Sequence, residues 1–464
     1  MRFCLALSVA IGISITSAAD WNRFRGPNGA GVGAGTGYPS ELSLSKNVLW
    51  KAAAPFGQSS PIIAGNRLFV TASEGDNLLT ICFDARSGAK LWTRTVKRER
   101  NTKTFKANDS ASPTPAADEN GVYSFFADYG LVAYTLDGKD RWTLKLGPFK
   151  NFYGMASSPI LAGDLIVLQC DQNAGSYLVA LDRKTGQQRW KTQRPGAGIS
   201  WSTPALFANG KELIVLGTSE LSSYYLATGE RRWWLPVGSM GAMGTPLVYR
   251  DTVLSVTAGT SDPWLDPFQT ALSKYDKDKD GLISHQEFLA FKDFAEHFGW
   301  LDANEDEKID AKEWDYVRMY GMGEFGAISV AAADAKGKVE PSAVRWRFKK
   351  NLPYIPSGLV YNDVYYMVRD GGIITSLDPA TGALLKEGRS KEALGEYYSS
   401  PVAADGKIYV INGDGKASVL KAGAQWEVLG VHDLGEEVRA TPALDAGRVF
   451  VRTKSAIYCF GGKS

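Results

Sequence analysis

The chain has 464 residues, of which 52 are lysine or arginine and 50 are aspartate or glutamate. This near balance excludes the strongly basic surface that binds nucleic acid, so no nucleic-acid partner is expected. The 49 glycines, 13 tryptophans and 20 tyrosines favour many short strands joined by tight turns.

The first segment predicts export. Arg2 precedes an apolar run at residues 3–15, and Ser17-Ala18-Ala19 offers small residues for cleavage. A membrane anchor is the alternative, but the run is shorter than the ~20 residues that a spanning helix needs. We therefore expect a signal peptide at residues 1–19, cleaved near Ala19, a periplasmic or secreted location, and no transmembrane segment in the mature chain.

A repeated unit follows an N-terminal extension at residues 20–45 and decides the fold. Each unit opens with a small residue, then Pro or Gly, then a short apolar strand. These steps are Ser60-Pro61, Ser112-Pro113, Ser158-Pro159, Thr203-Pro204, Thr245-Pro246, Ser357-Gly358, Ser400-Pro401 and Thr441-Pro442. Neighbouring steps lie 41 to 52 residues apart, except that 112 residues separate Pro246 from Gly358.

Each unit then continues with a turn and a tryptophan. The third strand ends in an Asp-x-x-Thr/Ser-Gly turn, as at residues 182–186, where Asp caps its own backbone and Gly accepts a positive φ. A tryptophan closes most units: Trp92, Trp142, Trp190, Trp233, Trp346 and Trp426.

Four short antiparallel strands in every unit predict an all-β fold, an eight-bladed β-propeller. The last unit has only three strands, and a lone strand at residues 47–50 can complete it and close the ring. An open sandwich or two domains is the alternative. The predicted organisation is blades 1 to 5 in residues 46–260, an insertion in blade 5 at residues 261–325, and the rest of the ring in residues 326–464.

The insertion contains a twelve-residue segment, residues 276–287, with the spacing of a calcium-binding EF-hand loop. Ca²⁺ requires six to eight oxygen ligands, and this spacing directs that many to one point. Gly281 permits the sharp turn, and the alternative is a solvated acidic turn. The expected ligands are Asp276, Asp278, Asp280, the Leu282 carbonyl, Ser284 and Glu287.

A second loop occupies residues 302–313. Its expected ligands are Asp302, Asn304, Asp306, the Lys308 carbonyl, Asp310 and Glu313. Glu307 stands where Gly is usual, and a non-glycine residue there costs roughly 1 kcal/mol for the left-handed conformation, so weaker affinity is expected. Ile283 and Ile309 fall where paired loops form a short β-bridge. Only residues 288–301 separate the loops, so a shared or sharply broken helix is expected between them.

Strand order predicts that the insertion joins the second and third strands of blade 5. In an up-and-down blade this loop opens on the face that carries the connections between blades. The same face should place seven side chains at the mouth of the central channel: Gln58, Asp109, Trp201, Met243, Tyr354, Tyr398 and Arg439. These residues either bind a ligand or cofactor or simply fill the ring.

The repeat resembles that of the pyrroloquinoline-quinone-like (PQQ-like) propeller family, best at residues 177–190, and the opening at residues 21–31 is similar to the start of exported bacterial members. This family includes quinoprotein dehydrogenases and the propeller subunit of the outer-membrane assembly machine. The resemblance implies PQQ as a cofactor in the dehydrogenases, held against two adjacent cysteines. No Cys-Cys pair occurs here: Cys82, Cys170 and Cys459 stand apart.

Three functions remain open from the sequence. The first is a non-catalytic, calcium-binding scaffold for a protein or another ligand. The second is a quinone-dependent oxidoreductase, against which the missing cysteine pair counts. The third is a carbohydrate-binding or carbohydrate-active propeller, which the aromatic residues at the mouth permit.

Overall fold

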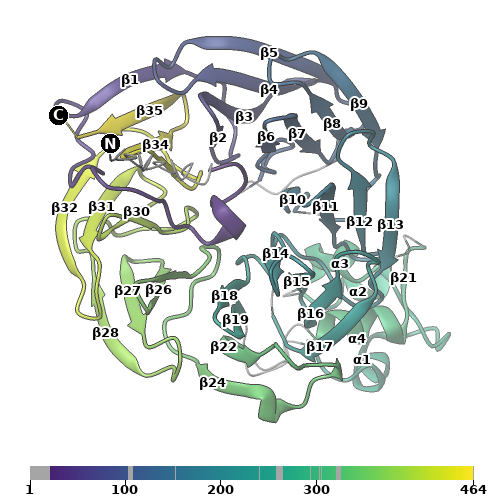
Figure 1. Cartoon of the computed structure of the whole chain (residues 1–464). Helices are drawn as coiled ribbons and strands as arrows, with labels where there is room; N and C mark the ends of the chain where they lie inside the picture. The colour runs from purple at the N-terminus through teal and green to yellow at the C-terminus, as the bar shows by residue number, and fades with distance from the viewer. Residues whose placement is uncertain are drawn as a thin grey trace, which may run out of the picture.

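The computed structural model describes residues 21–102, 108–151, 153–239, 241–257, 265–292, 294–302, 304, 306–319 and 325–462. Eight antiparallel sheets surround a central axis (Figure 1). The predicted eight-bladed β-propeller is therefore confirmed. The predicted signal peptide, residues 1–19, lies outside the described residues. No helix in the described ranges is long and apolar enough to cross a membrane.

The strands follow the chain around the ring. Blade 1 comprises β2 (Ile62–Ala64), β3 (Arg67–Glu74), β4 (Asn77–Asp84) and β5 (Lys90–Lys97). Blade 2 comprises β6 (Ala116–Asp118), β7 (Gly121–Phe126), β8 (Gly130–Tyr134) and β9 (Asp140–Lys145). Blade 3 comprises β10 (Ile160–Ala162), β11 (Leu165–Cys170), β12 (Tyr177–Asp182) and β13 (Gln188–Gln193). Blade 4 comprises β14 (Ala205–Phe207), β15 (Glu212–Leu216), β16 (Glu220–Tyr225) and β17 (Arg231–Pro236).

The second half of the ring repeats this order. Blade 5 comprises β18 (Leu247–Tyr249), β19 (Thr252–Thr257), β22 (Gly326–Ala331) and β24 (Val344–Phe348). Blade 6 comprises β25 (Leu359–Tyr361), β26 (Val364–Arg369), β27 (Ile373–Leu377) and β28 (Leu384–Arg389). Blade 7 comprises β29 (Val402–Ala404), β30 (Lys407–Ile411), β31 (Lys416–Lys421) and β32 (Glu427–Asp433). Blade 8 comprises β33 (Ala443–Asp445), β34 (Arg448–Arg452), β35 (Ala456–Gly461) and β1 (Val48–Ala53).

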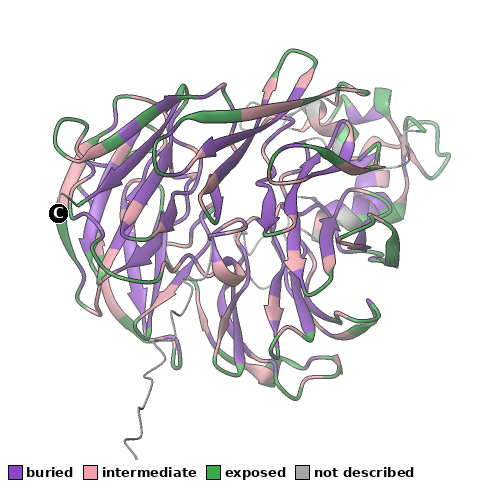
Figure 2. Cartoon of the chain, turned by 45° about the horizontal axis from the view of Figure 1, so that its top comes forward, coloured by how far each residue is buried: buried purple, intermediate pink, exposed green. Residues whose placement is uncertain are grey.

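The two ends of the chain share blade 8. Strand β1 pairs antiparallel with β35, with Trp50 opposite Cys459. This pairing leaves no free edge between the first and last blades, as the sequence predicted. Burial falls from the axis outwards: the short first strands contain no exposed residue, whereas outer strands such as β9 alternate between exposed and half-buried residues (Figure 2).

Tryptophans join neighbouring blades at their outer strands. The indole Nε1 of Trp50 donates to the Ala85 carbonyl of the next blade at 3.2 Å, and its ring lies under the turn glycine Gly88. A Cβ on Gly88 would stand 2.6 Å from that ring, so the turn requires glycine for its contact as well as for its φ of +74°. The same indole-to-carbonyl contact recurs from Trp92, Trp142, Trp190 and Trp346.

A second set of contacts joins the blades near the axis. Among the described residues, the amide of the small residue at seven of the eight steps donates to the hydroxyl of the corresponding residue in the next blade. Seven such bonds of 2.9 to 3.1 Å occur, from Ser60 to Thr114, Thr114 to Ser158, Ser158 to Thr203, Thr245 to Ser357, Ser357 to Ser400, Ser400 to Thr441, and Thr441 back to Ser60. We call this set the hydroxyl ring.

The hydroxyl ring corrects one sequence assignment. The step of blade 2 is Thr114-Pro115, immediately before β6, and not Ser112-Pro113. Both dipeptides fit the local pattern, but only Thr114 lies in register with Ser60 and Ser158 of the adjacent blades.

The N-terminal extension enters the central channel, where the short helix η1 (Pro27–Gly29) lies near the axis (Figure 1). Its backbone accepts hydrogen bonds from the first strands: Ile63 donates to Trp21 and Ala117 donates to Asn22. Arg25 donates to the Gly358 carbonyl at 2.6 Å. The extension therefore lines the channel and contacts several blades at once, which the sequence did not predict.

The remaining short elements lie mostly in the insertion between β19 and β22. It contains α1 (Phe268–Tyr275), β20 (Ile283–Ser284), α2 (His285–Phe288), η2 (Ala295–His297), α3 (Phe298–Leu301), β21 (Lys308–Ile309) and α4 (Ala311–Met319). After β22, β23 (Gly337–Lys338) adds a parallel fifth strand to blade 4, and η3 (Pro341–Ala343) precedes β24. The sequence did not predict the β23 pairing.

Replacing Thr441 by Val tests the hydroxyl ring. Valine keeps the branched shape but removes the acceptor for the Ser400 amide, which then lies buried without that partner. We expect a loss of about 1–3 kcal/mol in the free energy of unfolding, measured by urea denaturation. Thr441→Ser keeps the hydroxyl and serves as the control. Equal stability of Thr441→Val and wild type would show that the ring contributes nothing.

Candidate calcium centre and channel mouth

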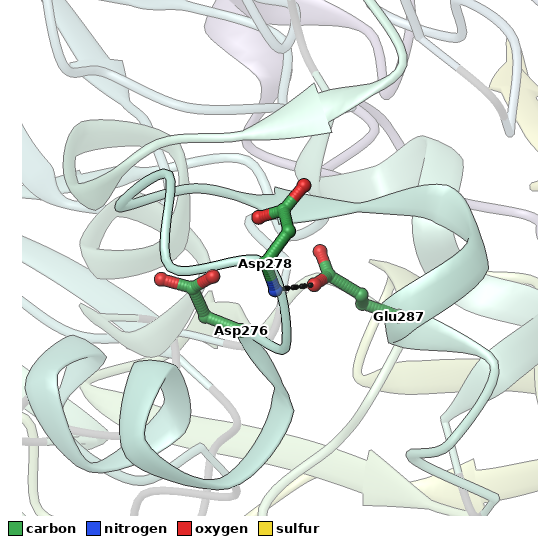
Figure 3. A group of neighbouring side chains, drawn as sticks. All are labelled: Asp276, Asp278 and Glu287. Carbon is green, nitrogen blue, oxygen red and sulfur yellow. Dashed lines mark hydrogen bonds between the residues drawn. The ribbon is translucent and has the colours of Figure 1, made fainter.

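The first acidic loop lies between α1 and α2. Figure 3 shows the carboxylates of Asp276, Asp278 and Glu287 directed towards one another, and one oxygen from each lies within 4.8 Å of the others. Glu287 accepts hydrogen bonds from the amides of Lys277 at 2.6 Å and Ser284 at 2.9 Å. The last residue of the loop therefore folds back over its first half.

The backbone of this loop has the expected sharp turn. Gly281 has a φ of +83°, and its amide donates to Asp276 Oδ2 at 3.0 Å. The other oxygen of the same carboxylate, Oδ1, is buried and has no hydrogen-bond partner. A buried carboxylate oxygen without a donor is costly unless a cation satisfies it. This orphaned oxygen fits the loop's oxygen-only donor set, which suits Ca²⁺.

The charge of Glu287 is fixed by its hydrogen bonds. Burial opposes ionisation, but four hydrogen bonds to the carboxylate outweigh it and lower the pKa of Glu287 to about 2. They come from the Ser284 amide and hydroxyl and from the Lys277 and Asp278 amides. Glu287 is therefore a carboxylate at neutral pH, and its negative charge is available to a cation.

The second loop repeats this arrangement. Glu313 accepts from the amides of Asn304 and Asp310, both at 3.1 Å, and Asp302 accepts from the amide of Glu307 at 3.1 Å. Glu307 has a φ of +65°, so a non-glycine residue does adopt the left-handed turn that the sequence required of it. The sixth position, glycine in the first loop and glutamate in the second, therefore carries more strain in the second loop.

The two loops form one unit. Ile283 pairs antiparallel with Ile309, and Lys308 of the second loop contacts Asp280 Oδ2 of the first at 2.6 Å. The segment between the loops is broken into α2, η2 and α3. Its phenylalanines pack together, with Phe288 and Phe298 buried and Phe291 and Phe294 against them. The loops therefore share a small aromatic core.

That core contacts the ring at the connection between blades 3 and 4. Ile199 belongs to the same buried cluster as Phe268 and Trp314, and Trp201 packs against it. Trp201 also donates to the Gly154 carbonyl at 2.8 Å and meets the Tyr153 ring edge-on at 5.5 Å. The insertion thus lies on the face of the inter-blade connections, which we call the connection face.

One group of mouth residues comes from blades 1, 2, 7 and 8. Asp109 accepts from the Gln58 amide at 3.1 Å, and the Arg439 guanidinium lies 4.8 Å from the Tyr398 ring centre. Burial raises the pKa of Asp109, while the Ala111 amide, Arg452, the Gln58 amide and Arg439 act in the opposite direction. The effect of burial is the largest, so the net shift in the pKa of Asp109 is upwards even though Arg452 and Arg439 oppose it.

A second group is aromatic. Tyr153 contacts Trp201, and burial and then the neighbouring Tyr354 raise the pKa of Tyr153. A Cβ on Gly241 would meet both Trp201 at 2.8 Å and Met243 at 3.3 Å, so these side chains border the same space. Asn108 donates to the Tyr153 carbonyl at 2.7 Å and links the two groups.

Sequence reasoning missed three residues of this face. Tyr153 lies five residues before the step at Ser158, whereas the predicted mouth residues lie only two or three residues before the steps assigned from the sequence. Glu396 accepts from the Tyr398 hydroxyl at 2.5 Å. Arg452 lies in β34, is fully buried and donates to the Ser59 hydroxyl at 2.7 Å. Its position in a strand gave no signal of a place near the mouth.

The cysteines do not fit a quinone site built on a vicinal disulfide. Cys82, Cys170 and Cys459 are free, buried and distributed over blades 1, 3 and 8. Burial raises the pKa of each thiol to about 12, so they behave as small apolar core residues.

Comparison with known proteins supports the fold assignment. Residues 42–265, just under half of the chain, match a family model described as outer membrane protein assembly factor BamB. A search of curated proteins finds no match. The BamB structure from Moraxella catarrhalis is 12% identical, with a TM-score of 0.56 over 89% of this chain and 96% of that one.

Two dehydrogenase structures are similarly distant. The quinohemoprotein alcohol dehydrogenase from Comamonas testosteroni is 12% identical, with a TM-score of 0.61 over 96% of this chain and 81% of that one. A europium-containing methanol dehydrogenase is 11% identical, with a TM-score of 0.61 over 96% of this chain and 98% of that one. Identities this low establish a shared propeller fold and nothing about activity.

Replacing Trp201 by Ala tests the contact between the insertion and the ring. Trp201→Ala removes the edge-on contact with Tyr153 and exposes the insertion core, so we expect about 3–5 kcal/mol of destabilisation and faster proteolysis within residues 265–319. Trp92→Ala, which disrupts blades 1 and 2 instead, is the matched control. The same cleavage pattern in both variants would contradict a specific contact.

Proposed function

From the premise that this chain has the PQQ-like propeller fold, we propose that it is an exported calcium-binding scaffold whose connection face binds a partner. The observation that carries the calcium assignment is the orphaned Asp276 Oδ1, buried beside the Asp278 and Glu287 carboxylates. When bound, Ca²⁺ would neutralise this cluster and fix the loop. The first loop supplies the ligands at residues 276–287, and the second supplies those at residues 302–313.

The first loop should bind more tightly than the second. Gly281 adopts its positive φ without a side-chain penalty, whereas Glu307 does not have that freedom. An exported protein meets calcium concentrations at which even weak loops fill, so both sites are expected to be occupied.

Titration calorimetry of the whole chain tests the calcium assignment. Glu287→Gln removes a charge and one strong ligand, so we expect its first loop to bind Ca²⁺ more weakly by on the order of tenfold or more. Glu313→Gln should weaken only the second loop. Equal binding by wild type and both variants would refute the assignment.

Lys308 should lower the affinity of the first loop. Its ammonium group lies 2.6 Å from Asp280 Oδ2 and competes with a cation for that carboxylate. Lys308→Met should therefore raise the calcium affinity of the first loop several-fold at low ionic strength, with a smaller gain at high salt, where the pair is screened. Lys274→Met, which removes a similar ion pair with Asp266 outside the loops, is the control. Unchanged affinity in Lys308→Met would contradict this competition.

The scaffold role is supported by the composition of the connection face. Tyr354, Trp201 and Tyr398 offer aromatic surface, and Arg439 lies over the Tyr398 ring. Aromatic residues and arginine are enriched in protein interfaces, and aromatic rings also stack on sugars. The partner is therefore a protein or a carbohydrate-bearing ligand.

Photo-crosslinking distinguishes this face from the outer wall. A photoreactive phenylalanine derivative at Tyr354, which is 47% exposed, should give a discrete calcium-dependent adduct in cells. The same derivative at Leu91, which is 48% exposed on outer strand β5, is the control. Adducts at both positions, or at neither, would contradict a binding function for the connection face.

The second candidate is quinone-dependent oxidation, favoured by the dehydrogenase structures of similar fold and by the half-buried Asp109 at the channel mouth. The dispersed cysteines count against it. A dye-linked dehydrogenase assay after addition of PQQ and Ca²⁺ separates the two functions. Turnover that is lost in Asp109→Asn would favour the oxidoreductase; absence of both binding and turnover would leave the scaffold.

A further inference from the structure

Two arginines of the N-terminal extension are buried in the central channel. Arg23 is 3% exposed and Arg25 is 0% exposed, and within the described residues no carboxylate offsets the charge of either one. Burial lowers the pKa of both to about 9, so both still carry a proton at neutral pH. Burying a charge without a counter-charge is strongly unfavourable, which makes this pair an unusual feature of a folded interior.

The two guanidinium groups are satisfied to different extents. Arg25 donates to four backbone carbonyls, those of Gly29, Ala30, Gly358 and Pro401. Among the residues that the structure describes, Arg23 donates only to the Pro204 carbonyl, at 2.5 Å, and its Nε and Nη1 are buried without a partner. Two of the three guanidinium nitrogens of a single cationic side chain are therefore left without a partner inside the channel.

The hydroxyl ring has its one gap at the same place. Among the described residues, seven of the eight inter-blade bonds are made, and the missing one would join the Thr203 amide to the Thr245 hydroxyl. Thr245 Oγ1 is buried and has no hydrogen-bond partner. Thr203 directly precedes Pro204, whose carbonyl is the one that Arg23 contacts.

A single backbone position relates these groups in space. A Cβ on Gly29 would lie 3.1 Å from Thr245 Cγ2 and 3.6 Å from Arg23 Nη2. The Arg23 and Thr245 side chains, which carry these unpaired polar atoms, therefore border the same part of the channel, between blades 4 and 5 and beside η1.

We propose that this part of the channel binds a small monovalent inorganic anion of the halide type, held by Arg23 and by the Thr245 hydroxyl. An acceptor-only ligand matches the excess of donors, and its charge compensates the buried guanidinium. A water molecule would fill the hydrogen bonds but leave the charge uncompensated. The anion would bridge the gap in the hydroxyl ring and so join blades 4 and 5 to the N-terminal extension.

Bromide provides the direct test. Crystals of the whole chain grown in sodium bromide should give an anomalous difference peak at the bromine edge within hydrogen-bond distance of Arg23 and Thr245. A water molecule, a protein carboxylate or an empty space at that position would overturn the proposal.

Thermal unfolding supplies a second test in solution. Chloride or bromide should raise the midpoint of wild-type unfolding above that in gluconate at equal ionic strength, because an anion that binds only the folded chain stabilises it. Thr245→Val should lose most of this difference, and Arg23→Met should lose all of it if it folds. Arg189→Met, which changes an exposed arginine, should retain it. An equal halide effect in all folded variants would overturn the proposal.

Discussion

The contact between neighbouring blades is the constraint on which the rest of the structure depends. A four-stranded blade has two apolar faces and cannot bury both by itself, so each blade is stable only between two others. The chain meets this requirement at two radii. The hydroxyl ring joins the first strands near the axis, and the tryptophans of the outer strands dock under the turn glycines of the next blade. Because β1 closes blade 8, both sets of contacts also join the last blade to the first.

These contacts also explain where the chemistry of the chain lies. The closed propeller places the connections between blades on one face. The insertion lies between β19 and β22 and projects from blade 5 on the same face. Trp201, in the connection between blades 3 and 4, packs against the aromatic core of the insertion. The acidic loops are therefore attached to the channel mouth through this connection as well as through β19 and β22. Ordering of the loops by a cation can therefore reach the channel mouth through Ile199 and Trp201.

The sequence predicted the features that are local or periodic. Eight units, the blade that carries the insertion and the turns of both acidic loops follow from residues close together in the chain. Ring closure follows from the repeat, because the last unit lacks one strand and a lone strand precedes the first unit. The step of blade 2 was misplaced because Ser112-Pro113 and Thr114-Pro115 satisfy the same local pattern, and only the register with Ser60 and Ser158 distinguishes them. The N-terminal extension could not be predicted to enter the channel, because its partners, such as Pro204 and Gly358, are distant in sequence and contribute only backbone atoms. The parallel pairing of β23 with blade 4 escaped for the same reason.

Hydrogen exchange of the intact chain, with and without Ca²⁺, tests the coupling between the acidic loops and the mouth most directly. The account predicts that calcium slows exchange in the loops at residues 276–287 and also in the connection that contains Ile199 and Trp201, while blade 1 and blade 7 are unchanged. No calcium-dependent protection in the loops, or protection in the loops with none in that connection, would contradict it.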